Sequence, residues 1–320
     1  MTAKPEATTD VPKRGYFFVI AAALLWGLSG TAAKFLFQIG ITPFSLVQMR
    51  LTGSATFLFL ALLVRQPRLL YIQPRDILYF VVLGTVGMAT VQFTYLFAIS
   101  KINVAAAILL QYLAPNLIAL YTVIVLHEKL TGTTVLALLS ATFGCYLVVG
   151  AYHLDVLRMN ELGIGSGLLS AASFAWYSIH GERGMRRYPP WTVLFYALFF
   201  SMLLWHILEP PFHFLDRSYS STEWLLIFYI VLLGTLVPFG LYFEGINLIR
   251  STRASITATL EPITAGVASY LFLHEVLELW QMIGDALVIG AVIGLQIKRE
   301  RDEKTPALLR AHAEDGAIHE

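Results

Sequence analysis

Long apolar runs separated by short polar breaks fill almost the whole chain. Each run is 18 to 25 residues long, and an α-helix needs about 20 apolar residues to cross the hydrocarbon core of a bilayer. The apolar positions are continuous and do not alternate, which favours helices over the strands of a membrane barrel. The pattern therefore predicts an all-α polytopic membrane protein with ten transmembrane helices, at residues 15–37, 44–64, 77–99, 102–126, 133–151, 163–181, 191–208, 223–246, 254–273 and 280–297.

The second half of the chain repeats the first. Trp26 recurs as Trp176 at a shift of 150 residues, and at a shift of 147 Pro43, Tyr95, Pro115 and His127-Glu128 recur as Pro190, Tyr242, Pro262 and His274-Glu275. We therefore expect two five-helix repeats, at 15–151 and 163–297, between tails at 1–14 and 298–320 that have no core of their own. Internal duplication is typical of secondary transporters, whose substrate site lies between the repeats near the middle of the bilayer.

The positions of lysine and arginine predict the orientation. If the N-terminus is cytoplasmic, 17 of the 22 Lys and Arg residues fall in cytoplasmic segments, and three, Lys101, Arg158 and Arg217, fall in outside loops. Cytoplasmic loops of membrane proteins carry such an excess, so we expect both termini to be cytoplasmic. Because each repeat has an odd number of spans, we expect the second copy to cross the membrane in the opposite direction, which makes the repeats inverted.

Composition agrees with a membrane protein and narrows its partners. Hydrophobic residues make up 57% of the chain and charged residues 13%, which is too little polar surface for a soluble domain. The net charge of +1 gives no sign of a nucleic-acid partner. Cys145 is the only cysteine, so an internal disulfide is excluded and we expect its side chain to pack in the core.

Several motifs resemble those of a known transporter family. The matching residues are Trp26-Gly27, Pro43 followed by Arg50, Ala105-Ala106-Ala107 leading to Pro115, and the pairs Pro115/Glu128 and Pro262/Glu275. With the five-plus-five plan, these motifs resemble the EamA-like family of the drug/metabolite transporter superfamily over residues 15–297. Within it, the chain looks most like the YddG-type exporters of aromatic and other amino acids. The resemblance implies an exporter in the bacterial plasma (inner) membrane that works by alternating access.

Aromatic and uncharged polar side chains near midspan are candidates for a substrate site, because they contact a ligand and tolerate desolvation. We expect the central cavity to be lined by Trp26, Ser29, Gln92, Tyr95, Gln111, Tyr112, Trp176, His180, Tyr242 and Glu261. Structural alternatives stay open. The tryptophans could fill grooves between helices, Ser29 could allow close helix contact, the tyrosines could form an interfacial belt, and His180 could meet interfacial water.

Prolines within the spans suggest where the helices bend, and acidic residues within the spans suggest where a proton or ion is coupled to transport. Pro115 and Pro262 lie at matching depths, and a proline bends a helix, so we expect hinges there; a static kink is the alternative. Glu244 and Glu261 are the acidic residues deepest in the predicted hydrocarbon. Charge there is costly, so both are candidates for proton or ion coupling, although Glu244 could simply pair with a nearby arginine. Arg50 is interpreted as a structural anchor, with a substrate clamp as the alternative.

Motifs for other chemistry are missing. The chain has no His-Glu-x-x-His and no Gly-x-x-x-x-Gly-Lys-Ser/Thr, and Gly163-x-Gly165-x-Gly167 lacks the strand and acidic residue of a dinucleotide site. We therefore expect no metal site, no cofactor and no enzymatic activity. An intramembrane enzyme or a receptor-like binding protein is the alternative class, and it would need a cluster of catalytic groups that the sequence does not suggest.

The sequence therefore predicts a secondary transporter that exports amino acids, aromatic and other neutral ones, and related amphipathic metabolites. The alternative is a proton-coupled exporter of cationic or lipophilic drugs, in which Glu261 releases a proton as the cargo binds. The expected partners are a small-molecule substrate and the lipid bilayer. A monomer and a homodimer both remain open.

Overall fold

The computed structural model describes residues 11–102, 104–153, 160–273, 278–297 and 304–318, and within these ranges it contains helices and no strands. The first half contains α1 (Val11–Gly27), α2 (Ser29–Gln38), α3 (Pro43–Arg65), α4 (Ile77–Val82), the π-helical turn η3 (Leu83–Ala89), α5 (Thr90–Lys101), α6 (Val104–Gln111), α7 (Ala114–Ile124) and α8 (Gly132–Val148). The second contains α9 (Glu161–Met185), α10 (Pro190–Leu208), α11 (Ser221–Val231), the π-helical turn η7 (Leu232–Leu236), α12 (Val237–Ala258), α13 (Glu261–Leu273), α14 (Leu279–Ile297) and α15 (Pro306–Ile318). Short 3-10 helices lie at η1 (Pro67–Leu70), η2 (Pro74–Asp76), η4 (Ala151–His153) and η6 (His213–Asp216).

The helices begin where the sequence offers a capping side chain. Thr42, Thr131 and Asn160 each accept a hydrogen bond from a backbone N–H in the first turn of α3, α8 and α9. Ser220 and Glu223 form a reciprocal capping box at the start of α11. Such caps satisfy backbone donors that a helix leaves unpaired, and here they fix where the chain enters the apolar bundle.

Eight helical segments in the described part of the chain are long and apolar enough to cross a membrane. Gly132–Val148 is a shorter apolar helix, and the 47-residue segment Ser221–Val267 covers two of the predicted spans. That segment is interrupted at Arg250, whose φ of 67° and ψ of 163° are not helical. The all-helical, multi-pass fold is thus confirmed, whereas the number of ten spans stays a prediction.

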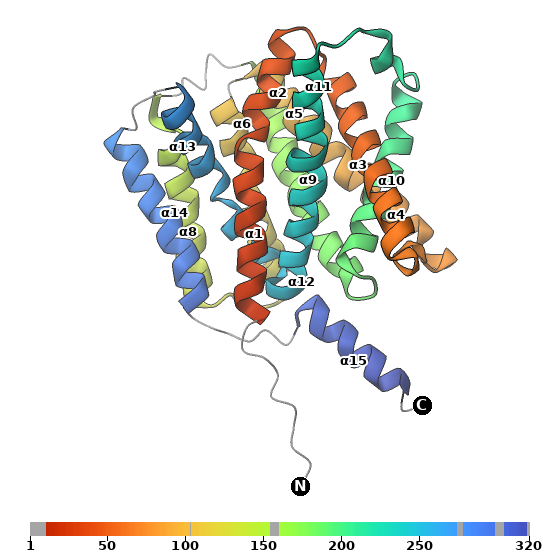
Figure 1. The fold of residues 1–320 in the computed structure, drawn as a ribbon. Helices are drawn as coiled ribbons and strands as arrows, with labels where there is room; N and C mark the ends of the chain where they lie inside the picture. Colours follow the sequence, from red (N-terminus) through yellow and green to blue (C-terminus); the bar gives the residue numbers. More distant parts are fainter. Residues whose placement is uncertain (1–10, 103, 154–159, 274–277, 298–303, 319–320) are drawn as a thin grey trace.

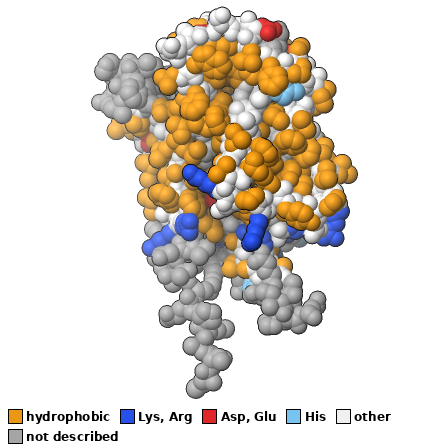
Figure 2. Space-filling model, turned by 45° about the vertical axis from the view of Figure 1, so that its right-hand side comes forward, with side chains coloured by type: hydrophobic (Ala, Val, Ile, Leu, Met, Phe, Trp, Pro, Cys, Tyr) orange, Lys and Arg blue, Asp and Glu red, His pale blue; other side chains and the backbone are white. Residues whose placement is uncertain are grey.

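The helices form one bundle, and the start of α1 lies at the same end as α15 (Figure 1). We call this the lower end and the opposite one the upper end. Hydrophobic side chains cover a broad band of the face shown in Figure 2, and the lysine and arginine side chains visible on it gather toward the lower end. This distribution is what the positive-inside rule requires if the lower end is cytoplasmic.

Glycines let neighbouring helices approach closely at one edge of the bundle. A Cβ added at Gly144 of α8 would lie 2.9 Å from the carbonyl oxygen of Gly284 in α14, and one added at Gly284 would lie 2.8 Å from the carbonyl oxygen of Gly144. The backbones of α8 and α14 are therefore in direct contact, and such close packing at small residues is typical of helices in lipid. The buried Cys145 lies in the same helix, as expected of a packing residue.

Breaks in the helices recur at the shift of the sequence repeat. The helical pattern stops at Tyr112 and Leu113 between α6 and α7, and again, 147 residues later, at Thr259 and Leu260 between α12 and α13. The π-helical turns η3 and η7 also occupy corresponding parts of the two halves. Pro115 and Pro262 each lie in the first turn of the helix after the break, where a missing N–H costs least.

Hydrogen bonds from the opposite half serve the backbone carbonyls at these irregular turns. Ser54 Oγ of α3 donates to the carbonyl oxygen of Val231 at 2.8 Å, beside η7. At a shift of 147 for both partners, Ser201 Oγ of α10 lies 2.7 Å from the carbonyl oxygen of Gly84 in η3, and its hydroxyl proton is shared with the carbonyl oxygen of Ala197 at 2.6 Å. Each half therefore satisfies the irregular backbone of the other, as hydrocarbon surroundings require.

Two tyrosines and an arginine act in the same way. Tyr229 Oη donates to the carbonyl oxygen of Leu25 at 3.2 Å, next to the break between α1 and α2. Tyr112 Oη lies 2.7 Å from the carbonyl oxygen of Ala258 at the end of α12. Arg50, deep in α3, donates to the carbonyl oxygen of Gly234 in η7 at 3.1 Å. All three bonds join residues of one half to the backbone of the other.

The described part of the C-terminal segment contains one helix. The prediction that residues 298–320 have no core of their own stays a prediction, and α15 contacts α9 and α12 at the lower end (Figure 1). Arg310 donates to the carbonyl oxygens of Met185 and Tyr188 at the end of α9. The segment folds because Pro306 starts a helix of alanine and leucine, and because the arginine satisfies carbonyls that the end of α9 leaves unpaired.

We predict that Ser54→Ala and Ser201→Ala each lower the free energy of unfolding by about 1 kcal/mol, the value typical of a hydrogen bond between membrane helices. Thermal unfolding in detergent measures the change, and Thr56→Ala, on the exposed side of α3, is the matched control. If either serine variant unfolds at the same temperature as the control, then the hydrogen bond from that hydroxyl to the backbone carbonyl contributes nothing to stability.

The inversion of the repeats has a direct topological test. Gln73 and Ser218 are exposed and follow the corresponding helices α3 and α10. In a Cys145→Ala background, we expect a membrane-impermeant maleimide to label Ser218→Cys in intact cells, and Gln73→Cys only after permeabilisation. Labelling of both cysteines from the same side would contradict the inverted arrangement.

Candidate functional site

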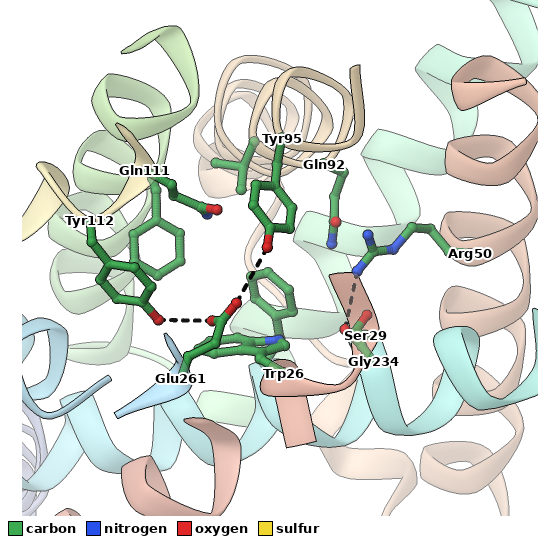
Figure 3. Close-up of a pocket in the computed structure, with 12 residues that line it drawn as sticks. Trp26, Ser29, Arg50, Gln92, Tyr95, Gln111, Tyr112, Gly234 and Glu261 are labelled. Atoms are coloured by element: carbon green, nitrogen blue, oxygen red, sulfur yellow. Dashed lines mark hydrogen bonds between the residues drawn. The ribbon is translucent and has the colours of Figure 1, made fainter. Parts of the chain in front are cut away.

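A small cavity lies where the broken helices of the two halves meet (Figure 3). Its volume is 30 Å³, and it is lined by Trp26, Ser29, Arg50, Val91, Gln92, Tyr95, Gln111, Tyr112, Phe174, Gly234, Phe239 and Glu261. Both halves contribute to the lining, together with the π-helical turn at Gly234 and the break before α13. Aromatic walls with a few polar groups are typical of small-molecule sites.

Glu261 is the acidic group of the cavity. It is the first residue of α13 and only 7% exposed, and the positive end of that helix favours its negative charge. Tyr95 Oη donates to one carboxylate oxygen at 3.3 Å, and Tyr112 Oη lies 2.8 Å from the other. In Figure 3 both phenols point at the carboxylate, one from α5 and one from the break after α6.

Arg50 lies on the opposite side of the cavity from Glu261 (Figure 3). Its side chain is 3% exposed, and the guanidinium donates through Nε to Thr235 Oγ1 at 2.8 Å and through a terminal nitrogen to the carbonyl oxygen of Gly234 at 3.1 Å. Both acceptors are uncharged, and no described carboxylate pairs with this arginine. The cavity thus holds one fixed cation and one acidic group that do not neutralise each other directly.

Trp26 is the large aromatic surface of the cavity. Its ring lies 5.0 Å from that of Phe239 and 6.3 Å from that of Phe174, both in edge-to-face geometry. Tyr242 supports it from behind at 5.5 Å and shares a hydrogen bond of 3.0 Å with Ser178. Because these contacts fix the orientation of the rings, the rings form a rigid apolar surface for an apolar ligand group.

Seven of the ten residues expected in the cavity line it, namely Trp26, Ser29, Gln92, Tyr95, Gln111, Tyr112 and Glu261. Tyr242 is fully buried one layer behind. Trp176 and His180 stack on each other at 4.0 Å, and His180 faces a separate cavity of 210 Å³ toward the lower end. Glu244 lies outside the cavity, where the charges of Arg14 and Arg310 act on it.

Sequence reasoning missed several lining residues. Phe174 and Phe239 are ordinary apolar residues in apolar runs, so nothing in the pattern separates them from lipid-facing or packing phenylalanines. Arg50 carried a usable signal, because a cation so deep in a span is costly unless something binds it. The sequence favours an anchor over a substrate clamp, and the structure shows that Arg50 both holds η7 and lines the cavity.

The cavity is too small for a metabolite in this conformation. A volume of 30 Å³ is room for one or two water molecules, whereas small-molecule sites enclose roughly 300 Å³ or more. A substrate therefore enters only after helices move apart.

An ion-pair network, which we call the lower latch, joins the two halves at the lower end. Arg250 donates to Glu182 of α9 at 3.0 Å and to Glu128, between α7 and α8, at 2.8 Å. Glu182 also accepts from the backbone N–H and hydroxyl of Ser251, and so caps the helix that restarts after Arg250. Lys304 donates to Glu128 at 2.9 Å, so the segment before α15 belongs to the same network.

Glu128 keeps the lower latch charged at neutral pH. Partial burial works to raise its pKa, but the hydrogen bonds and charges of Lys304 and Arg250 outweigh burial and hold the pKa below the usual 4.5. A carboxylate with a lowered pKa contributes stability that is present above pH 4.5 and is lost as the pH falls through the lowered value. The latch is therefore intact under physiological conditions.

Side chains also bind the helices together toward the upper end. Lys34 of α2 donates to the carbonyl oxygens of Ile99 and Ile102 at 2.7 and 3.0 Å, at the end of α5. Gln48 of α3 donates to the carbonyl oxygen of Glu209, just after α10, at 3.3 Å. The central cavity thus lies between two sets of polar contacts, one toward each end of the bundle.

Acidic residues, histidines and the cysteine do not cluster in the described ranges in a way that could hold a metal ion. His127 and Glu128 lie at the lower end, where Glu128 serves the latch. His274 and Glu275, their counterparts in the repeat, lie outside the described residues.

Comparison with known proteins agrees with a multi-pass membrane protein built from two halves. The sequence profile of the EamA-like transporter family matches residues 13–150 and, a second time, residues 161–296. The chain therefore belongs to the EamA-like transporter family, as the sequence motifs predicted.

Curated relatives extend along nearly the whole chain. The "Uncharacterized inner membrane transporter YicL" of Salmonella typhimurium is 28% identical over 90% of this chain and 97% of its own length. An "Uncharacterized transporter" of Archaeoglobus fulgidus is 30% identical over 83% of this chain and 91% of its own. Both names agree with membrane transport, and neither states a substrate.

A solved structure shares the fold. A chain whose title reads "Crystal structure of protein" superimposes with a TM-score of 0.71, covering 89% of this chain and 97% of its own length, at 21% sequence identity. At that identity the likeness shows the fold alone.

We predict that Glu182→Gln destabilises the protein more than Glu128→Gln. Glu182 is 5% exposed, and removing one partner of a buried pair costs about 3 kcal/mol, whereas an ion pair nearer water contributes about 1 kcal/mol or less. Chemical unfolding in detergent gives both values, with the exposed Glu161→Gln as control. An equal loss in the two latch variants would mean that Glu182 does not hold the helix restart at Ser251.

Proposed function

We propose that this membrane transporter exports amino acids, neutral and aromatic ones above all, from the cytoplasm by alternating access. The observation that carries the proposal is the cavity itself, which pairs an aromatic wall at Trp26 with polar groups from both halves. A ligand with one apolar and one polar part suits such a lining. The direction of transport and the amino-acid class rest on the resemblance of the chain to YddG-type exporters.

The cavity also suits alternating access. Its volume is 30 Å³, and it lies between polar contacts that join the two halves toward both ends of the bundle. The helix breaks before Pro115 and Pro262 are places where a segment can tilt without losing continuous helical hydrogen bonds, because those bonds are already interrupted. We propose that the halves move about these breaks, so that the lower latch opens while the upper contacts hold, and the reverse.

A hydrogen-bond count at Tyr112 favours proton coupling. Its single hydroxyl proton faces two acceptors, the carbonyl oxygen of Ala258 at 2.7 Å and Glu261 at 2.8 Å. A phenol donates one full hydrogen bond, so both contacts are satisfied together only when Glu261 is protonated and donates to the phenol oxygen. Loss of that proton turns the phenol toward the carboxylate and leaves the end of α12 unsatisfied.

The same observation supports a second candidate function, the proton-coupled export of cationic or lipophilic drugs. In both candidates Glu261 exchanges a proton for a positively charged group of the cargo. They differ at Arg50, because a buried cation in the cavity repels a cationic drug, whereas the carboxylate of an amino acid compensates it. We therefore favour the amino-acid function.

Transport into proteoliposomes tests the proposal. We expect labelled tryptophan or phenylalanine to accumulate when a pH gradient is imposed, and we expect Glu261→Gln to abolish accumulation because the exchangeable proton is gone. Counterflow at equal pH on both sides measures binding and movement without the gradient. No exchange of any amino acid by the wild type would overturn the substrate class.

Glu244→Gln is the matched comparison, since Glu244 is the other candidate for proton coupling and lies outside the cavity. It is expected to keep gradient-driven accumulation. Accumulation lost in Glu244→Gln but kept in Glu261→Gln would transfer the coupling role to Glu244. Equilibration that ignores the gradient and survives Glu261→Gln would mean a facilitator.

A further inference from the structure

We propose that Arg50 binds the carboxylate of the substrate and that, with Glu261 binding the ammonium group, the cavity selects zwitterionic α-amino acids. This inference rests on the proposed function and names the residues that would recognise the substrate. It differs from the role of structural anchor, which the hydrogen bonds to Gly234 and Thr235 alone would explain.

The hydrogen-bonding capacity of Arg50 is only partly used. A guanidinium carries five N–H donors, and the structure gives this one two partners, both uncharged. Three donors are left without a partner among the described residues, on a side chain that is 3% exposed and lines the cavity. A buried cation with free donors is costly, and a carboxylate satisfies it with charge and with paired hydrogen bonds.

The two charged groups of the cavity are held apart. Arg50 is tied to η7, and Glu261 is tied to the phenols of Tyr95 and Tyr112. Because their own partners hold them on opposite sides of the cavity (Figure 3), they are positioned to meet opposite ends of one ligand. A zwitterion matches both groups at once. A simple amine leaves the buried charge of Arg50 unpaired, and a simple acid lacks the ammonium group that replaces the proton of Glu261.

Two further groups fit the same ligand. The Gln92 side chain lies between Tyr95 and Arg50 (Figure 3), and within the described part of the chain its amide has one hydrogen-bond partner, the Met88 sulfur at 3.3 Å. It is therefore available to a carboxylate beside Arg50. Trp26 forms the adjacent wall, which suits an apolar or aromatic side chain of the amino acid.

A ligand series tests the inference. Phenylalanine, its amide, phenethylamine and 3-phenylpropionate are compared as competitors of labelled phenylalanine in counterflow by the full-length protein. In the wild type we expect the amide and the amine to compete about 10- to 100-fold more weakly than the amino acid, the loss typical of one hydrogen-bonded charged contact. Equal competition by the amino acid and its amide would overturn the role of Arg50 even without a variant.

The variants separate recognition from structure. We expect Arg50→Gln to weaken phenylalanine and leave its amide almost unchanged, so that the preference for the carboxylate disappears; Arg50→Lys should keep part of it. Ser54→Ala is the matched control, because Ser54 also holds the backbone beside η7 but does not line the cavity. It should affect both compounds alike. A preference that survives in Arg50→Gln would show that the arginine is an anchor only.

The experiment distinguishes failure of the proposed function from failure of the carboxylate-binding role of Arg50. If the wild type exchanges none of the four compounds, the amino-acid function is overturned and the role of Arg50 in binding it is overturned as well. If the wild type exchanges phenylalanine and its amide equally, the transport function stands and only the carboxylate-binding role is overturned.

Discussion

Backbone hydrogen bonding in lipid is the constraint on which this structure depends. Carbonyl groups at irregular turns have no water to bind, so each needs a donor from the protein. Here the donors come from the opposite half: Ser54 serves the turn beside η7, Ser201 serves η3, and Tyr112 serves the end of α12. At these turns the other half completes the hydrogen bonding of the broken helix. The breaks lie around the central cavity, so the bonds that hold the halves together also define the site.

This arrangement links substrate binding to movement. Arg50 holds η7 of the second half, and Tyr112 and Tyr95 of the first half hold Glu261 of the second. A ligand whose ammonium group binds Glu261 competes with the phenols of Tyr95 and Tyr112, and the energy of binding can thus be used to separate the halves. Lys304 ties the segment before α15 to Glu128, so the C-terminal segment stabilises the state in which the lower latch is closed.

The hydropathy pattern and the repeat predicted much of this structure. Long apolar runs suffice to locate helices, and Trp26, Tyr95, Tyr112 and Glu261 were found because polar and large aromatic groups at midspan are unusual. It was harder to predict which side of each helix faces the cavity. The π-helical turns η3 and η7 shift the register of the helices that follow, so the 3.6-residue periodicity does not carry through to Tyr242, which lies behind the cavity wall. The stack of Trp176 on His180 depends on how α9 packs, and the fold of α15 depends on carbonyls of α9 that only the tertiary structure supplies.

The central claim is that one cavity between the halves is reached from one side of the membrane at a time. Spin labels at Lys129 and Arg186 span the lower end, and labels at Gln38 and Ser218 span the upper end, each pair joining the two halves at exposed positions. Pulsed electron paramagnetic resonance in nanodiscs measures both distances with and without a transported amino acid. The account predicts that one distance lengthens while the other shortens. Two distances that lengthen together, or that stay constant while transport proceeds, would contradict it.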